Sequence, residues 1–137
     1  MIMGKNSSEQ PNDRKRILVM DDEELVRLFA EKMLDKLGYD VETVREGEAA
    51  LRRYEEAKKS GKPFSLVILD ISVDKGLDGR ETIKALREFD PEVTAVVSSG
   101  YSSAPVMVDY AAFGFQGRIS KPFELDELIE VLENQIS

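Results

Sequence analysis

The chain has 137 residues, of which 42% are hydrophobic and 34% charged, and its formal net charge is −8. This composition predicts one soluble globular domain, and no apolar run approaches the roughly 20 residues that a membrane helix needs. The sequence has no cysteine and no histidine, which excludes disulfides, thiolate zinc sites and histidine catalysis, so a metal would be held by oxygen, as Mg²⁺ prefers.

The start of the chain is polar and then turns into a short apolar run. Residues 1–15 show no apolar period, so we expect a disordered tail or linker there and a domain over residues 16–137. The tail also lacks the apolar centre of an export signal, which favours a cytoplasmic protein. The run Ile17–Met20 predicts a buried strand that ends at Asp21 and Asp22.

The rest of the chain alternates between strand and helix patterns. Short apolar runs predict further strands over residues 40–44, 64–70, 94–99 and 117–120. Apolar residues at helical spacing, together with glycine and proline boundaries, predict helices over residues 26–37, 46–60, 79–89, 105–113 and 125–136. This order predicts an α/β fold, a single doubly wound (βα)5 domain with a five-stranded parallel sheet and right-handed crossovers.

Polar side chains follow four of the predicted strands. They are Asp21 and Asp22, Asp70, Ser98 and Ser99, and Lys121. Because the carboxyl ends of parallel strands share one edge of the sheet, we expect these groups to lie together. Crowded carboxylates repel one another, and Lys121 with a divalent cation would neutralise them. Such a site suits a phosphoryl group, with Asp70 as the nucleophile and a hydroxyl as a hydrogen-bond donor. Strand alternation predicts that Ser98 and Ser99 point in opposite directions, with Ser98 as a buried neighbour.

Over residues 16–137 the chain resembles the receiver domain of two-component response regulators. The resemblance rests on four motifs, which are Asp21-Asp22 after Ile17–Met20, Asp70 after Leu66–Leu69, Ser99 after Ala95–Ser98, and Lys121-Pro122-Phe123. The segments Val97–Ser102 and Gly114–Gly117 look most like receivers attached to hybrid sensor histidine kinases. The resemblance therefore implies a module of phosphorelay signal transduction.

The resemblance also implies a role for each motif residue. Asp70 would accept a phosphoryl group from the phosphohistidine of a histidine kinase or histidine phosphotransfer domain, and Lys121 and Ser99 would contact the phosphoryl oxygens. The implied Mg²⁺ ligands are Asp22, Asp70 and the backbone carbonyl of Ser72, with Asp21 acting through a metal-bound water. The Lys121–Pro122 peptide bond is expected to be cis.

Other consequences of the resemblance concern activity and partners. The domain would catalyse only its own phosphorylation and dephosphorylation. The face formed by the fourth helix, fifth strand and fifth helix would be the usual surface for a homodimer. The net negative charge argues against a large nucleic-acid surface, and we expect neither nucleic acid nor membrane as a partner.

Two places depart from the common receiver pattern. Asp74 and Asp78 occupy positions where receivers often carry proline and glycine, and Gly79 indicates a loop that is one residue longer. Arg118 occupies the position of the usual aromatic switch, so either nearby Phe115 takes that role or the coupled switch is absent.

Two other functions stay open on the residues alone. One is a Mg²⁺-dependent phosphatase with an aspartyl nucleophile, although such enzymes usually carry an acid where this chain has Ser72. The other is a degenerate receiver that acts as an interaction module, against which the complete set of acids, hydroxyl and lysine argues.

Overall fold

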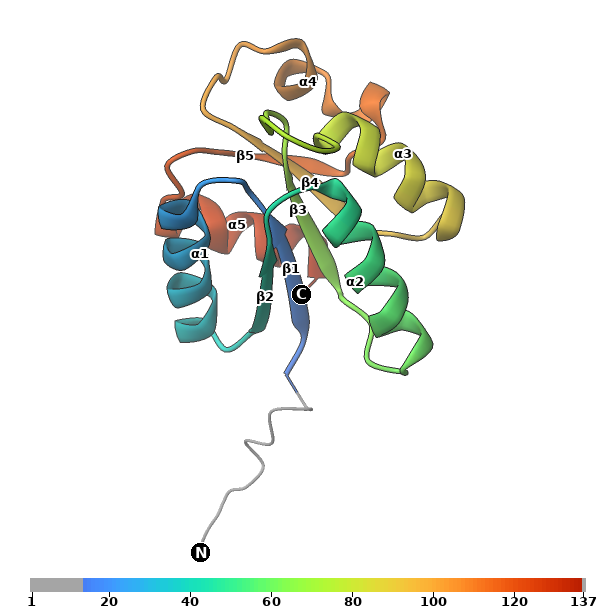
Figure 1. Ribbon diagram of the computed structural model, residues 1–137. Helices are drawn as coiled ribbons and strands as arrows, with labels where there is room; N and C mark the ends of the chain where they lie inside the picture. Colours follow the sequence, from blue (N-terminus) through green and yellow to red (C-terminus); the bar gives the residue numbers. More distant parts are fainter. Residues whose placement is uncertain (1–13, 137) are drawn as a thin grey trace, which may run out of the picture.

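The computed structural model describes residues 14–136, so residues 1–13 of the expected tail lie outside the described residues. Five parallel strands form one sheet in the order β2-β1-β3-β4-β5 (Figure 1), and they are β1 (Arg16–Met20), β2 (Asp40–Val44), β3 (Leu66–Asp70), β4 (Ala95–Ser99) and β5 (Gly117–Ser120). The helices are α1 (Glu24–Lys36), α2 (Gly47–Lys59), α3 (Gly79–Phe89), α4 (Pro105–Val108), a 3₁₀ helix η3 (Tyr110–Phe113), and α5 (Leu125–Ile136). This is the doubly wound fold that the alternating pattern predicts.

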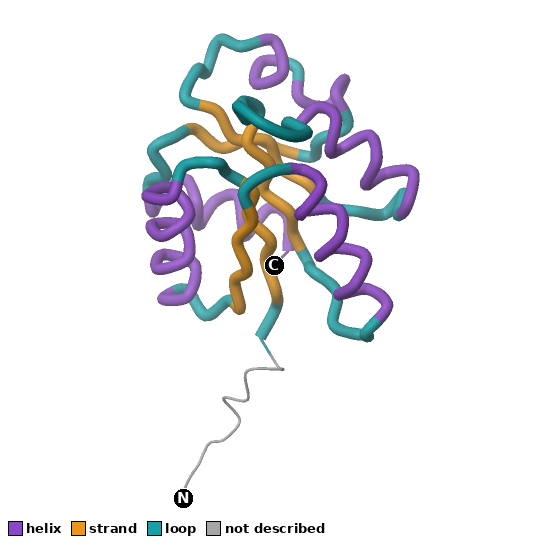
Figure 2. The backbone as a smooth tube through the Cα atoms, in the orientation of Figure 1, coloured by secondary structure: helices purple, strands orange, loops and turns teal. Residues whose placement is uncertain are grey.

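Helices cover both faces of the sheet (Figure 2) and give the domain two core layers. On β3, Val67 and Leu69 pack into the layer beneath α2 and α3, which we call the α2/α3 face. Leu66 and Ile68 pack into the layer beneath α1 and α5, which we call the α1/α5 face. Because every residue of β3 is buried, its sequence is a continuous apolar run that ends in one carboxylate.

The single helix predicted over residues 105–113 is wrong, since the structure has two short helices there. α4 ends after Val108, because Asp109 leaves the helical conformation with φ −128° and ψ 60°. Valine and aspartate have low helix propensity, which weakens this segment. Gly114, at φ 97°, then ends η3 in the left-handed conformation that glycine tolerates.

The start of α3 lies very close to the end of β3. Asp78 caps the helix, and its carboxylate accepts the Glu81 N–H while the Glu81 side chain accepts the Asp78 N–H. A Cβ atom on Gly79 would lie 2.7 Å from the backbone oxygen of Asp70. Only glycine therefore permits this approach, which brings the start of α3 against the strand that carries Asp70.

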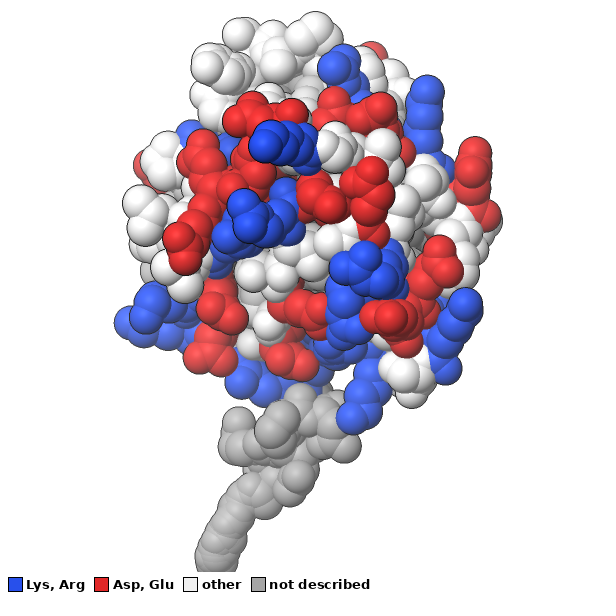
Figure 3. All heavy atoms as spheres, in the orientation of Figure 1, with Lys and Arg blue, Asp and Glu red and all other residues white. Residues whose placement is uncertain are grey.

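Acidic and basic side chains are mixed on the surface of the domain. Figure 3 shows acidic side chains interspersed with Lys and Arg, with no continuous basic surface on the face that it shows.

At the start of the described chain, Arg14 Nε donates to the Gly38 carbonyl at 2.8 Å, and Lys15 Nζ donates to the Ile136 carbonyl at 2.7 Å. Between residues 14 and 136, every helix is too short or too polar to cross a membrane.

Candidate functional site

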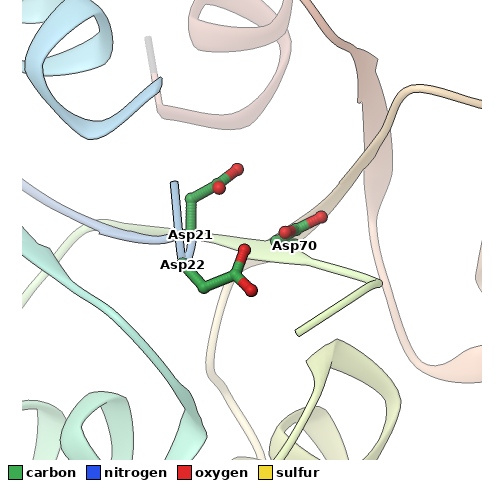
Figure 4. A group of neighbouring side chains, drawn as sticks. All are labelled: Asp21, Asp22 and Asp70. Atoms are coloured by element: carbon green, nitrogen blue, oxygen red, sulfur yellow. The ribbon is translucent and has the colours of Figure 1, made fainter. Parts of the chain in front are cut away.

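Three aspartates meet at the carboxyl edge of the sheet. Asp21 and Asp22 follow β1, and Asp70 ends the neighbouring strand β3. Each contributes one carboxylate oxygen to a group whose members all lie within 4.8 Å of one another (Figure 4). We call these three residues the acidic cluster. The sequence prediction that strand ends bring them together is confirmed.

Lys121, which follows β5, lies against the acidic cluster. Its Nζ is 3.0 Å from Asp21 Oδ2 and 3.3 Å from Asp70 Oδ1. Burial lowers the pKa of Lys121, but the hydrogen bond that Lys121 donates to Asp21 and the negative charges of Asp70 and Asp21 raise this pKa by more. One ammonium group thus bridges two carboxylates, and it balances only one of the three negative charges.

Backbone groups hold the other carboxylates in place. Asp21 Oδ1 accepts the Glu23 N–H at 3.0 Å, and Asp22 Oδ2 accepts the Asp74 N–H at 3.0 Å. The Asp74 contact joins the acidic cluster to the loop between β3 and α3. Arg27 donates from Nη1 to the Asp21 carbonyl at 2.9 Å, a contact that no sequence motif indicated.

Asp70, like Asp21, is almost completely buried. Its side chain is 2% exposed, and Oδ1 accepts hydrogen bonds from Lys121 Nζ and from the Ser72 N–H, each at 3.3 Å. Its Oδ2 atom is buried with no hydrogen-bond partner. Burial and the charge of Asp21 raise the pKa of Asp70 to about 6, while Lys121 and the Ser72 N–H act in the opposite direction. The single positive charge of Lys121 therefore leaves the negative charge of the site incompletely neutralised.

This arrangement fits a hard divalent cation. Mg²⁺ is bound in proteins through one or two carboxylates, with water and substrate oxygens completing its shell. The acidic cluster offers converging oxygens, an unpartnered Asp70 Oδ2 and excess negative charge. Ser72 lies beside Asp70 through its N–H, and the use of its carbonyl as a ligand stays a prediction.

Ser99 ends β4 at the same edge of the sheet, whereas Arg118 and Phe115 lie elsewhere. Ser99 is buried, its Oγ accepts the Tyr101 N–H at 3.0 Å, and its carbonyl accepts the Lys121 N–H at 2.9 Å. Arg118 donates from Nη1 to the Met107 carbonyl of α4 at 2.9 Å. Phe115 is buried in the core of the α2/α3 face. The Lys121–Pro122 bond is cis, as expected.

Known proteins share both the sequence pattern and the fold. The sequence profile described as the response regulator receiver domain matches residues 17–133. The chain is 32% identical over 122 residues to the response regulator receiver protein CpdR of Brucella abortus, covering 89% of this chain and 97% of that protein. It is 27% identical to the chemotaxis protein CheY of Thermotoga maritima, covering 90% and 98%. The solved structure of CheY4 from Vibrio cholerae aligns with a TM-score of 0.79 at 25% identity, covering 90% and 99%.

Proposed function

Because the chain belongs to the response regulator receiver domain family, we propose that it accepts a phosphoryl group on Asp70 during two-component signalling. The observation that carries this proposal is the environment of Asp70. One of its oxygens is held by Lys121 and the Ser72 N–H, and the other has no partner. A buried carboxylate that is oriented but incompletely neutralised is suited to attack an electrophilic phosphorus.

The donor we propose is the phosphohistidine of a histidine kinase or a histidine phosphotransfer domain. An Asp70 oxygen forms the new bond to phosphorus while the bond from phosphorus to the histidine nitrogen breaks, and the imidazole leaves. With a pKa of about 6, Asp70 is mostly ionised at neutral pH, as a nucleophile must be. Lys121 pairs with a phosphoryl oxygen, and the Ser99 hydroxyl donates to another.

Mg²⁺ is the cofactor that the acidic cluster supports. Asp22, Asp70 and the Ser72 carbonyl would hold it directly, and Asp21 through a water molecule. When bound, it would supply positive charge against the phosphoryl oxygens. Three further expectations stay predictions. They are attachment to a hybrid sensor kinase, a homodimer through the face of α4, β5 and α5, and a cytoplasmic location.

The test is phosphorylation by a small donor. The protein is incubated with Mg²⁺ and acetyl phosphate, and intact mass is measured for the wild type, Asp70→Asn and Asp74→Asn. We expect one phosphoryl adduct on the wild type, and none on Asp70→Asn or in EDTA. Asp74→Asn is the matched control, because its exposed carboxylate adjoins the cluster and the change retains the N–H that bonds Asp22.

Metal binding is measured separately by thermal unfolding. Mg²⁺ should raise the melting temperature of the wild type more than that of Asp22→Asn, because a ligand of the folded state alone stabilises it. A wild-type protein that responds to Mg²⁺ but forms no adduct would contradict phosphoryl acceptance. Release of many phosphates per chain from several unrelated donors would indicate a phosphatase instead.

A further inference from the structure

Two buried side-chain atoms in residues 14–136 have no hydrogen-bond partner, and they are Asp70 Oδ2 and Ser98 Oγ. Both residues are 1% exposed. Buried polar atoms in native proteins nearly always have a partner, because an unpartnered one is destabilising. Two such atoms close together can satisfy one another.

The strand register places these two residues side by side. β3 and β4 are parallel, and Asp70 is the direct partner of Ser98 across the ladder. The Ile71 N–H donates to the Ser98 carbonyl at 3.0 Å, which fixes this register at the end of the sheet. Neighbouring strands lie about 4.8 Å apart, so a hydroxyl on one can reach a carboxylate on the other.

Both side chains also lie on the same face of the sheet. Ile68 and Val96 belong to the core of the α1/α5 face, and strand alternation puts Asp70 and Ser98, two residues further on, on that face as well. Lys121 follows the same alternation from Ile119, the β5 partner of Ser98. The hydroxyl of Ser98 is therefore on the side of the sheet where Lys121 meets Asp70.

Ser99 occupies the opposite side. It follows the parity of Val97, which packs into the α2/α3 face, and its Oγ already accepts the Tyr101 N–H. The prediction that the two serines lie on opposite faces agrees with this register, but the expectation that Ser98 points away from the acceptor does not. The sequence did not indicate that Ser98, rather than Ser99, is the ladder partner of Asp70.

We propose that Ser98 is a second hydroxyl of the acceptor site, a positioning residue that donates its hydrogen bond to Asp70 Oδ2. This inference rests on the proposed function of Asp70. After a change of the Ser98 rotamer, this one hydrogen bond gives both Asp70 Oδ2 and Ser98 Oγ a partner. A carboxylate oxygen has a second lone pair, so Oδ2 remains available for binding or attack. Ser98 thereby fixes the orientation of the Asp70 carboxylate, while Ser99 lies on the other face of the sheet.

The first test measures the rate of phosphorylation. Ser98→Ala, Ser98→Thr and Ser65→Ala are incubated with Mg²⁺ and acetyl phosphate, and adduct formation is followed by intact mass. We expect Ser98→Ala to slow the reaction about five- to tenfold, because a hydrogen bond to a charged group is lost. Ser98→Thr keeps the hydroxyl and should restore most of the rate. Ser65→Ala is the control, because Ser65 directly precedes β3 at the end far from Asp70, and it should leave the rate unaltered.

The second test needs neither metal nor donor, and it compares melting temperatures in EDTA at pH 8. If Ser98 supports Asp70, Ser98→Ala should melt lower than the wild type, and the drop should shrink in an Asp70→Asn background, as a double-mutant cycle reveals. A hydroxyl without a partner would give the opposite sign, because removing it relieves a buried polar group.

The outcomes separate this inference from the proposed function. The role of Ser98 is overturned if Ser98→Ala reacts at the wild-type rate or melts at a higher temperature than the wild type. A wild-type protein that accepts no phosphoryl group refutes the proposed function, whereas the EDTA comparison still decides whether Ser98 contacts Asp70.

Discussion

Ionised Asp70 should destabilise the metal-free protein at alkaline pH. Its folded-state pKa is about 6, against an ordinary value of 3.8, because burial and the charge of Asp21 disfavour the carboxylate. A raised carboxyl pKa contributes stability that is fully present below about pH 4 and is lost as the pH rises through about 6. Replacing Asp70 with asparagine removes this titration, so Asp70→Asn should be the more stable protein at pH 8.

The size of the effect follows from the shift. About two pKa units at about 1.36 kcal/mol each give a penalty of about 3 kcal/mol at pH 8. Near pH 4 the same relation leaves about 0.5 kcal/mol, since the carboxyl is then protonated in the folded state. The advantage of Asp70→Asn over the wild type should therefore grow by about 2.5 kcal/mol between pH 4 and pH 8.

The assay is urea unfolding in EDTA, followed by circular dichroism at several pH values. Asp74→Asn serves as the control, because its exposed side chain should show no such trend. Addition of Mg²⁺ at pH 8 should reduce the advantage of Asp70→Asn by stabilising the wild type. A constant difference between the two proteins across this pH range would refute the reasoning, as would an Asp70→Asn protein that is less stable at pH 8.

Three further substitutions probe the packing around Asp70, a buried hydrogen bond between α2 and the end of α3, and the charge of Lys121. Gly79→Ala should lower the free energy of unfolding by about 1–3 kcal/mol, because its Cβ would meet the backbone of β3. The control Gly100→Ala places its Cβ in open space and should change the free energy of unfolding by less than about 0.5 kcal/mol. Equal effects of the two variants in urea denaturation would contradict this. Tyr54→Phe removes the hydroxyl that donates to Asp90 at 2.6 Å and should cost about 1–2 kcal/mol in the same assay, so an unchanged midpoint would exclude a role for the bond. Lys121→Met should destabilise the protein in EDTA by about 2–4 kcal/mol and increase its thermal response to Mg²⁺; a response no larger than that of the wild type would show that Lys121 does not neutralise the acidic cluster.

The features that the sequence predicted are those encoded within one element. The continuous apolar run of β3 marks a strand buried on both faces, and its position before Asp70 places that carboxylate at the sheet edge. The spacing in α1 identifies the helix but only part of its buried stripe, because Phe29 is 49% exposed and the buried Leu34 lies outside the predicted set. Gly38, at φ 99°, follows the helix as expected. Because motif residues follow their strands directly, predicting the strands was enough to assemble the acidic cluster and Lys121.

The features that the sequence did not predict depend on two elements at once. The contact of Arg27 with the Asp21 carbonyl depends on how α1 leaves β1. The pairing of Ser98 with Asp70 depends on the register between β3 and β4, which neither strand encodes alone. The break at Asp109 reflects a balance of weak helix propensities against packing, and apolar spacing does not record that balance.

The hydrogen bond from Lys121 to Asp21 spans 100 positions of the chain. During synthesis from the N-terminus, Asp21, Asp22 and Asp70 leave the ribosome well before the lysine does. Until β5 docks, Lys121 cannot form its contacts with Asp21 and Asp70. The contacts of Lys121 with Asp21 and Asp70 therefore form only after the last strand has joined the sheet, so the charge balance of the acidic cluster depends on a residue near the end of the domain.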